Sequence, residues 1–189
     1  KIISILLSND EKDIAINWLK KVRIKTQKLN FYSLEMGMYH ALKLDYEDAI
    51  DEYLLYLKYS PNNIQMVTQR VMLLADYEIS TDIIRKKLQK ADTKESKIIL
   101  SKLEFKLKNY QIAYNLIKDI KNSDNYKIDF IEDLIKINEF DLAQTVISDL
   151  INSSKNKTIL NKSIFQLAVL YEMQITDSIN QFTIINDIY

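Results

Sequence analysis

Apolar and polar residues alternate along this chain with a period of three to four residues over nearly its whole length. Such spacing gives a helix one apolar face, so it predicts a succession of amphipathic helices joined by short polar turns. About a dozen helices in pairs are expected on this basis. Their predicted ranges are 1–8 and 11–24, 31–43 and 46–59, 63–76 and 80–91, 95–107 and 110–121, 125–137 and 140–152, and 158–173 and 176–188.

The pattern also repeats at a longer period. Each repeat unit begins with polar and aromatic residues, continues to a small residue, and has an apolar residue three or four positions after the small one. Ala15 and Ala49 are 34 residues apart, and Ala113 and Ala143 are 30 apart. Two further units fit the same period, with Ile83 or Ile84 and then Ser178 in the place of the alanine. A period of this size is typical of arrays of helix pairs, and a small residue lets two antiparallel helices pack closely.

The only glycine, histidine and proline of the chain lie close together, at Gly37, His40 and Pro61. Glycine inside a helix costs about 1 kcal/mol relative to alanine, so Gly37 indicates a close helix contact. Pro61 follows the second helix of its pair and is expected to end it. His40 is expected to pack between helices, because a general base or metal ligand usually needs converging partners.

Residues 30–63 resemble one tetratricopeptide repeat over its full length. The matching positions are Gly37, Tyr46, Ala49, Tyr53 and Pro61, and the departures are Ser33, Leu44 and Tyr56. The other units resemble the repeat more weakly but keep its period. The resemblance implies an all-α fold, an α-solenoid of about five to six antiparallel helix pairs wound into a right-handed superhelix. It implies a single domain over residues 1–189, with the first helix truncated.

The resemblance further implies a concave groove lined by the first helix of each pair. The groove positions of the family fall on Phe31, Leu34, Met38, Leu42, Met72, Ile98, Lys102, Phe105, Lys106, Ile128, Glu132, Ile135 and Lys136. Some of these side chains could instead pack between repeats. An apolar groove with charges at its edge suits an extended or helical peptide segment. In chaperone-binding members of the family, lysine and asparagine hold a carboxylate where Leu34 and Met38 stand here, so that clamp is expected to be absent.

Composition narrows the possible functions. Lys plus Arg and Asp plus Glu are 26 each, and this balance argues against a nucleic-acid partner. A single glycine cannot form a phosphate-binding loop, and the chain has no cysteine, which excludes thiolate chemistry and disulfides. No apolar run is long enough for a membrane span. We therefore expect no enzyme activity, no cofactor and no metal site.

Charged clusters have ordinary interpretations. The acidic run that begins at Asp45 stands at the start of a helix, where Asp45 is expected to cap and the other carboxylates to suit the helix dipole. The basic segment Arg85–Lys90 is expected to be a solvated helix face. The many tyrosines fall at helical spacing and are expected to pack in the core.

Three functional classes stay open. The first is a non-catalytic scaffold that binds a protein segment in the groove. The second is a structural subunit or homo-oligomer that uses its ends or its convex face, for which the apolar Ile2, Ile3 and Leu6 would be suited. The third is a helical accessory domain of a longer protein. The richness in Ile, Lys, Asn and Tyr favours an AT-rich bacterial genome. The expected location is the cytoplasm or a periplasmic, envelope-tethered position, and the missing cysteine and the start without Met favour the envelope.

Overall fold

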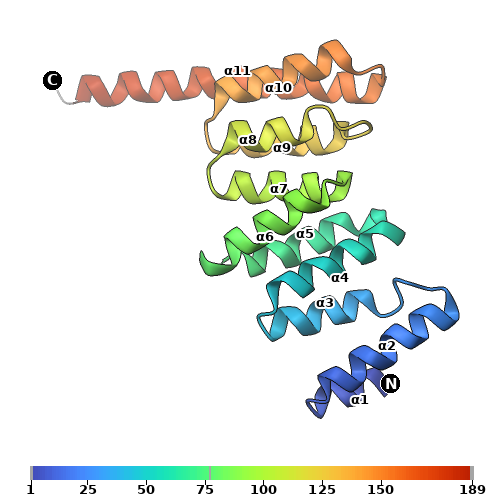
Figure 1. The fold of residues 1–189 in the computed structure, drawn as a ribbon. Coiled ribbons are helices and arrows are strands. Elements are labelled where there is room, and N and C mark those ends of the chain that lie inside the picture. The colour runs from blue at the N-terminus through green and yellow to red at the C-terminus, as the bar shows by residue number, and fades with distance from the viewer. Residues whose placement is uncertain (1, 77, 188–189) are drawn as a thin grey trace. The chain divides into compact units, whose positions relative to one another are not determined.

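The computed structural model describes the backbone of residues 2–76 and 78–187 and the side chains of residues 2–76 and 79–176. Every regular element in these ranges is a helix (Figure 1), which confirms the predicted all-α class. The elements are α1 (Ile2–Ser8), α2 (Lys12–Thr26), α3 (Ser33–Leu42), α4 (Tyr46–Tyr59), the 3-10 helix η1 (Pro61–Asn63), α5 (Ile64–Leu74), α6 (Glu78–Ala91), α7 (Lys94–Lys106), α8 (Tyr110–Ile117), α9 (Asp124–Lys136), α10 (Phe140–Ser153) and α11 (Lys157–Asp187).

The last predicted helix pair, 158–173 and 176–188, is wrong. One continuous helix, α11, spans Lys157–Asp187 (Figure 1). The two residues between the expected helices, Gln174 and Ile175, are neither glycine nor proline. Without a residue that opposes helical dihedral angles, the helix continues through them. Ser178, expected as the small residue of the last unit, lies outside the residues whose side chains are described.

The contacts of the chain divide it into two compact units, residues 1–103 and 104–189, and the division falls inside α7. In the first unit α1 packs against α2, α3 packs against α4, and α4 also contacts α5 and α6. In the second unit α10 contacts α8, α9 and α11, and α9 also contacts α11. Each unit thus has its own set of packed helices.

One turn geometry recurs four times within the described residues. It stands before α2, α4, α8 and α10, where Asp10, Leu44, Lys108 and Asn138 have left-handed backbones with φ between 61° and 64°. The next residue donates its backbone N–H to the carbonyl oxygen five positions earlier. Asp45, for example, donates to His40 at 2.9 Å, and the three equivalent bonds are 2.9–3.0 Å. This is the Schellman arrangement, which satisfies carbonyl groups at the end of a helix.

The predicted small residues each lie five positions after these left-handed residues. Ala15, Ala49, Ala113 and Ala143 are all fully buried. In the unit that lacks the alanine, Ile84 is fully buried and Ile83 only partly, so Ile84 takes the equivalent place. The sequence period therefore corresponds to a structural period: a left-handed turn, a new helix, and a small buried residue in its second turn.

The helix end at Pro61 is also as predicted. Helix α4 ends at Tyr59, and Ser60 has an extended φ of −139°. Pro61 disfavours helical dihedral angles in the residue before it and begins η1. The chain then enters α5 directly at Ile64.

Candidate functional site: an apolar helix face and its neighbouring hollows

The outer face of α3 carries a row of apolar side chains. Leu34, Met38 and Leu42 follow one another at intervals of four residues on the helix, and Phe31 stands in the turn that precedes it. Leu34 is half-buried, whereas Phe31 and Met38 are exposed and Leu42 exposes 83% of its surface. Because of their spacing, the three helical residues share one side of α3. We call these four residues the α3 face.

The opposite side of α3 holds the helix in place. Its buried residues are Ser33, Met36, Gly37 and His40. Met36 belongs to an apolar cluster with Ile3, Ala15 and Leu19, drawn from α1 and α2. Helix α3 is therefore packed on one side and apolar on the other, and the apolar outer side contacts solvent.

Three residues predicted to line the groove are corrected by their burial. Ile98, Ile128 and Ile135 expose only 4%, 4% and 5% of their surfaces. Helix α9 buries six residues because both α10 and α11 pack against it. The groove prediction assumed that the first helix of a pair is covered on one face only. Ile98 and Ile135 are core residues in this structure, and Ile128 reaches the surface only at the floor of a hollow.

The remaining predicted residues keep some accessibility. Met72 and Lys102 are half-buried, and Lys106 and Lys136 are exposed. Phe105 is half-buried in an aromatic cluster, with its ring centroid 5.0 Å from that of Tyr110 and 5.4 Å from that of Phe130. The last, Glu132, is half-buried and accepts a hydrogen bond of 2.9 Å from Nε2 of Gln166.

A hollow of about 420 Å³ lies between α9 and α11 in the second unit. Ile128, Asp129 and Glu132 line it from α9, and Asn161, Lys162, Phe165 and Gln166 line it from α11. Phe165 is well exposed, and the lining includes the ammonium group of Lys162 and the carboxylates of Asp129 and Glu132. The contribution of α11 was missed in the sequence, although the aromatic Phe165 beside Lys162 could have indicated an exposed helix face.

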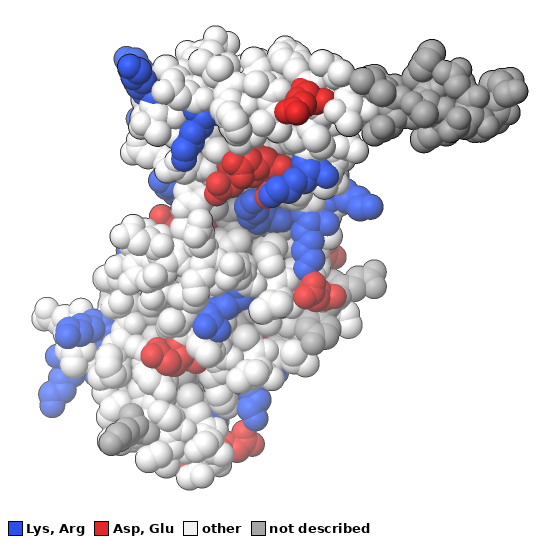
Figure 2. Space-filling model, turned by 180° about the vertical axis from the view of Figure 1, so that it is seen from behind, with Lys and Arg blue, Asp and Glu red and all other residues white. Residues whose placement is uncertain are grey.

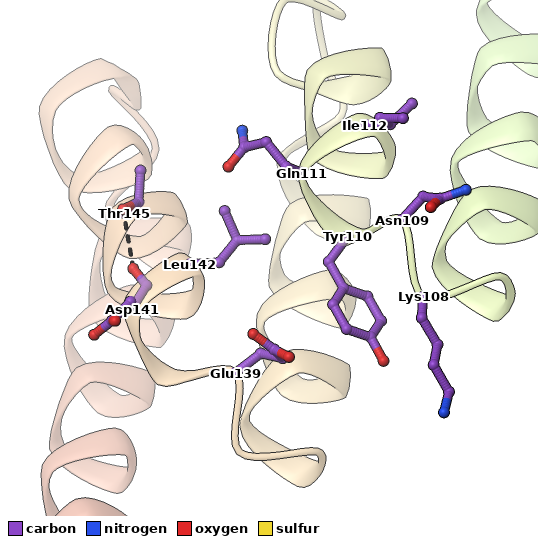
Figure 3. A pocket seen from close by; sticks show the side chains of 9 residues that line it. All are labelled: Lys108, Asn109, Tyr110, Gln111, Ile112, Glu139, Asp141, Leu142 and Thr145. Carbon is purple, nitrogen blue, oxygen red and sulfur yellow. Dashed lines mark hydrogen bonds between the residues drawn. The ribbon is translucent and has the colours of Figure 1, made fainter.

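A second hollow, of about 570 Å³, lies between α8 and α10 (Figure 3). Gln111 and Leu142 extend into the space between the two helices, whereas Ile112 points away from α10. Tyr110 and Glu139 lie at one end, beside the starts of the two helices. The lining mixes amide, phenol, carboxylate and alkyl groups, and no single ligand chemistry follows from it. These residues come from second helices, which the groove prediction did not include.

His40 lies at a junction of three helices. Its ring is buried, and Nδ1 is 3.4 Å from Oδ2 of Asp45 and 3.7 Å from Oδ2 of Asp48. The ammonium group of Lys12, from α2, stands 2.6 Å from the same Oδ2 of Asp45. The expectation that Asp45 caps α4 with its side chain is wrong, since that side chain makes no capping bond and pairs with Lys12 and His40 instead.

This junction brings together three side chains of the types that bind metal ions. The ligand atoms of His40, Asp45 and Asp48 lie within 4.8 Å of one another. However, the ammonium group of Lys12 already provides the positive charge that Asp45 requires, and its hydrogen bond holds the pKa of Asp45 below its ordinary value, with a smaller contribution from His40. A divalent ion would have to displace Lys12. The arrangement therefore fits a structural link between α2, α3 and α4 better than a metal site.

Charges of both signs are mixed on one face of the molecule. On the face drawn in Figure 2, Lys and Arg side chains lie interspersed with Asp and Glu. Nucleic-acid binding depends on clustered positive charge, and that face does not favour it. Among the described residues, no helix combines the length and the apolar character that a membrane span requires.

Comparisons with protein-family models, with curated proteins and with solved structures found no match. The resemblance to tetratricopeptide repeats therefore rests on the residues of this chain alone. Its solenoid arrangement and its groove remain predictions.

Proposed function

We propose that the chain is a non-catalytic interaction module that binds a protein segment on the α3 face. The observation that carries the proposal is the outward row of Leu34, Met38 and Leu42 on a helix whose other side is anchored in the core, together with the exposed Phe31 in the turn before that helix. Contiguous exposed apolar side chains are typical of interaction sites. A rigid helix that presents them loses little conformational freedom on binding.

The partner best suited to this face is an amphipathic helical segment. The apolar side chains are spaced by three to four residues, and a helix with its own apolar residues at the same spacing can interdigitate with them. Charged residues of both signs flank the row, with Glu35 beside Leu34 and Lys43 beside Leu42. The recognition is thus expected to be mainly apolar, with charges that set the orientation.

Two further observations support a binding function over catalysis. His40 is the only histidine of the chain, and its ring is buried with Nδ1 facing two carboxylates, so it is not presented to a substrate. The recurring turn and buried alanine also support the proposal of an array of repeated helix pairs, and such arrays commonly serve as binding surfaces.

The test is a comparison of partner capture by three forms of the protein. The first is the wild type, and the second carries Leu34→Glu, Met38→Glu and Leu42→Glu. The control carries three equivalent changes at exposed apolar residues elsewhere, Ile24→Glu, Ile79→Glu and Ile112→Glu. All three are first checked for equal helix content and thermal stability.

The proposal predicts a protein that the wild type and the control capture and the α3 variant loses. The recombinant partner segment should then bind the wild type directly in calorimetry, with at least a tenfold weaker affinity for the α3 variant. A partner that binds the α3 variant and the wild type equally well would contradict the proposal and point to another face of the molecule.

A further inference from the structure

Helix α11 has a buried face and a separate, exposed apolar face. The inner face is buried against α9 and α10 and includes Ile159, Ser163, Gln166 and Leu170. The other face includes Ile164, Ala168, Tyr171 and Ile175, all of which are exposed. Ile164 exposes 57% of its surface, Tyr171 45% and Ile175 61%. We call these four residues the α11 seam.

The spacing of the α11 seam is that of a helix–helix interface. Its members follow at intervals of four, three and four residues, which is the heptad spacing that keeps an apolar row facing a partner helix. A surface helix normally has one apolar stripe and a polar outer side. The α11 seam departs from this expectation. In the sequence the spacing continues at Ser178, Phe182 and Ile185, whose side chains lie outside the described residues.

The charged residues of α11 are unevenly distributed, with the basic ones near its beginning and an acidic one further along. Lys157 and Lys162 stand in its first two turns, and Glu172 follows ten residues after Lys162. No charged residue lies between Lys162 and Glu172. If two copies of this helix paired in parallel, lysine would lie beside lysine. In an antiparallel pair, the basic beginning of each helix lies toward the acidic half of the other, and the helix dipoles are opposed as well.

Side-chain size agrees with the antiparallel arrangement. A two-fold axis that passes between Val169 and Leu170 sets Ile164 opposite the second copy's Ile175, and it sets Ala168 opposite the second copy's Tyr171. The small Ala168 leaves room for the large tyrosine ring, and the two isoleucines are of equal size. Volume alternation of this kind allows an interface to close without voids.

From the spacing, the charge direction and the side-chain sizes together, we infer that the chain forms a two-fold symmetric dimer in which the α11 seams of two copies pair antiparallel. This interface is independent of the α3 face, which belongs to the other unit. The molecule would therefore present two α3 faces per dimer, and a bivalent partner would bind with increased avidity.

Sedimentation equilibrium over a range of protein concentrations tests the dimer. The wild type should be dimeric at micromolar concentrations. The Ile164→Glu, Ile175→Glu variant should raise the dimer dissociation constant at least tenfold, because each charge would be buried at the interface. Ala168→Arg is a second variant, and all of these positions are exposed in the single copy, so folding should be kept. The matched control is Ile112→Glu with Ile137→Glu, which should leave the dimer intact.

Engineered cysteines test the direction of pairing, and the chain has no native cysteine to interfere. Under oxidising conditions, a mixture of the Ile164→Cys and Ile175→Cys chains should form a mixed disulfide dimer. Either chain alone should not, because in the antiparallel pair each cysteine stands about 16 Å along the helix from its own copy. Crosslinking of each variant to itself would indicate a parallel pair. A monomeric wild type, or a dimer that the seam variants leave unchanged, would overturn the inference.

Discussion

The aromatic ring of Tyr53 on α4 lies against the backbone of Gly37 on α3. A Cβ atom added at Gly37 would be 2.6 Å from both Cδ1 and Cε1 of Tyr53, closer than real Cβ contacts permit. Tyr53 is itself buried, with neighbours on its other sides. The only glycine of the chain therefore marks a close contact between the two helices, as the sequence predicted.

Replacement of Gly37 by alanine should destabilise the protein. Alanine favours the helix by about 1 kcal/mol, but overpacking in a core costs about 1–3 kcal/mol. We expect a net loss of about 1 kcal/mol in the free energy of unfolding, measured by urea denaturation. Tyr53→Leu should cost stability alone, yet reduce the penalty of Gly37→Ala in the double variant. Additive effects of the two changes would contradict the steric explanation.

Leu44 has a left-handed backbone with φ of 61° and an exposed side chain. That conformation costs a residue with a Cβ atom about 1–2 kcal/mol, and glycine avoids the cost. Leu44→Gly should therefore stabilise the protein by about 0.5–1 kcal/mol, since glycine also increases the entropy of the unfolded chain.

Leu42 is the matched control, two residues away and more exposed, but inside α3. Leu42→Gly should destabilise the protein by about 1 kcal/mol, because glycine is unfavourable within a helix. Thermal denaturation of the two variants measures the difference. Changes of the same sign in both would mean that the turn geometry is not the cause.

Arg23 of α2 and Glu52 of α4 form a two-pronged ion pair, with N–O distances of 2.8 and 2.7 Å. Their side chains are 12% and 17% exposed, and Nε of Arg23 also donates to the carbonyl oxygen of Phe31 at 2.9 Å. Lysine cannot reproduce this planar fork. Arg23→Lys should cost about 1–3 kcal/mol of stability.

Salt distinguishes this pair from the exposed ones. A half-buried pair is screened little, so the cost of Arg23→Lys should persist at high ionic strength. Lys97→Gln, which removes an exposed pair with Asp92, should change stability little at any salt concentration. Urea denaturation at low and high salt compares the two. If the stability cost of Arg23→Lys disappeared at high salt, the Arg23–Glu52 pair would contribute no more than an ordinary surface ion pair.

Tyr114 donates a hydrogen bond from its hydroxyl group to the carboxylate of Asp149. Burial raises the pKa of Tyr114 well above its ordinary value, and the hydrogen bond to Asp149 raises the pKa further. Below the unfolded-state pKa of about 10 both states keep the proton, and the full stabilisation is present. Above it the unfolded state loses its proton first, so stability falls as pH rises.

Tyr114→Phe should therefore cost about 1–2 kcal/mol at neutral pH, because a charge-assisted hydrogen bond is lost. The variant should also lose less stability than the wild type between about pH 9.5 and 11. Denaturation across that range measures the slopes. Other groups with raised pKa, such as Tyr53 and Lys12, titrate in both proteins, so the comparison isolates Tyr114. Parallel slopes would mean that Tyr114 does not contribute to the alkaline loss.

Much of the fold could be predicted from local patterns. The range predicted for 46–59 matches α4, and the starts predicted at Tyr110 and Phe140 match α8 and α10. These helices begin after polar turns and carry a clear apolar period, which is information local to the sequence. Helix α8 ends at Ile117, four residues before its predicted end, and α11 does not divide. Helix ends depend on weak preferences that tertiary packing can override.

The candidate site was less accessible to sequence reasoning. The residues of the α3 face were predicted from a well-matched repeat and a periodic apolar pattern, and their side chains are accessible in the structure. Ile98, Ile128 and Ile135 were placed by the same positional rule, yet they are buried. The rule assumes that each first helix buries one face, and helix α9 is covered from two directions. A sequence pattern identifies apolar residues but does not tell which of two apolar sides a neighbour covers.

The sequence by itself determined the helical class, the period of the turns and the small residues at helix contacts. Each of these follows from interactions within about one or two turns of chain, such as helix propensity, left-handed turns and the volume of one side chain. Only the tertiary structure decided which apolar residues reach the surface, that Asp45 pairs with Lys12 and His40 instead of capping α4, and that α11 keeps an exposed seam. Those outcomes depend on which helices lie beside one another, and burial and pairing between distant residues are set by that arrangement rather than by local sequence.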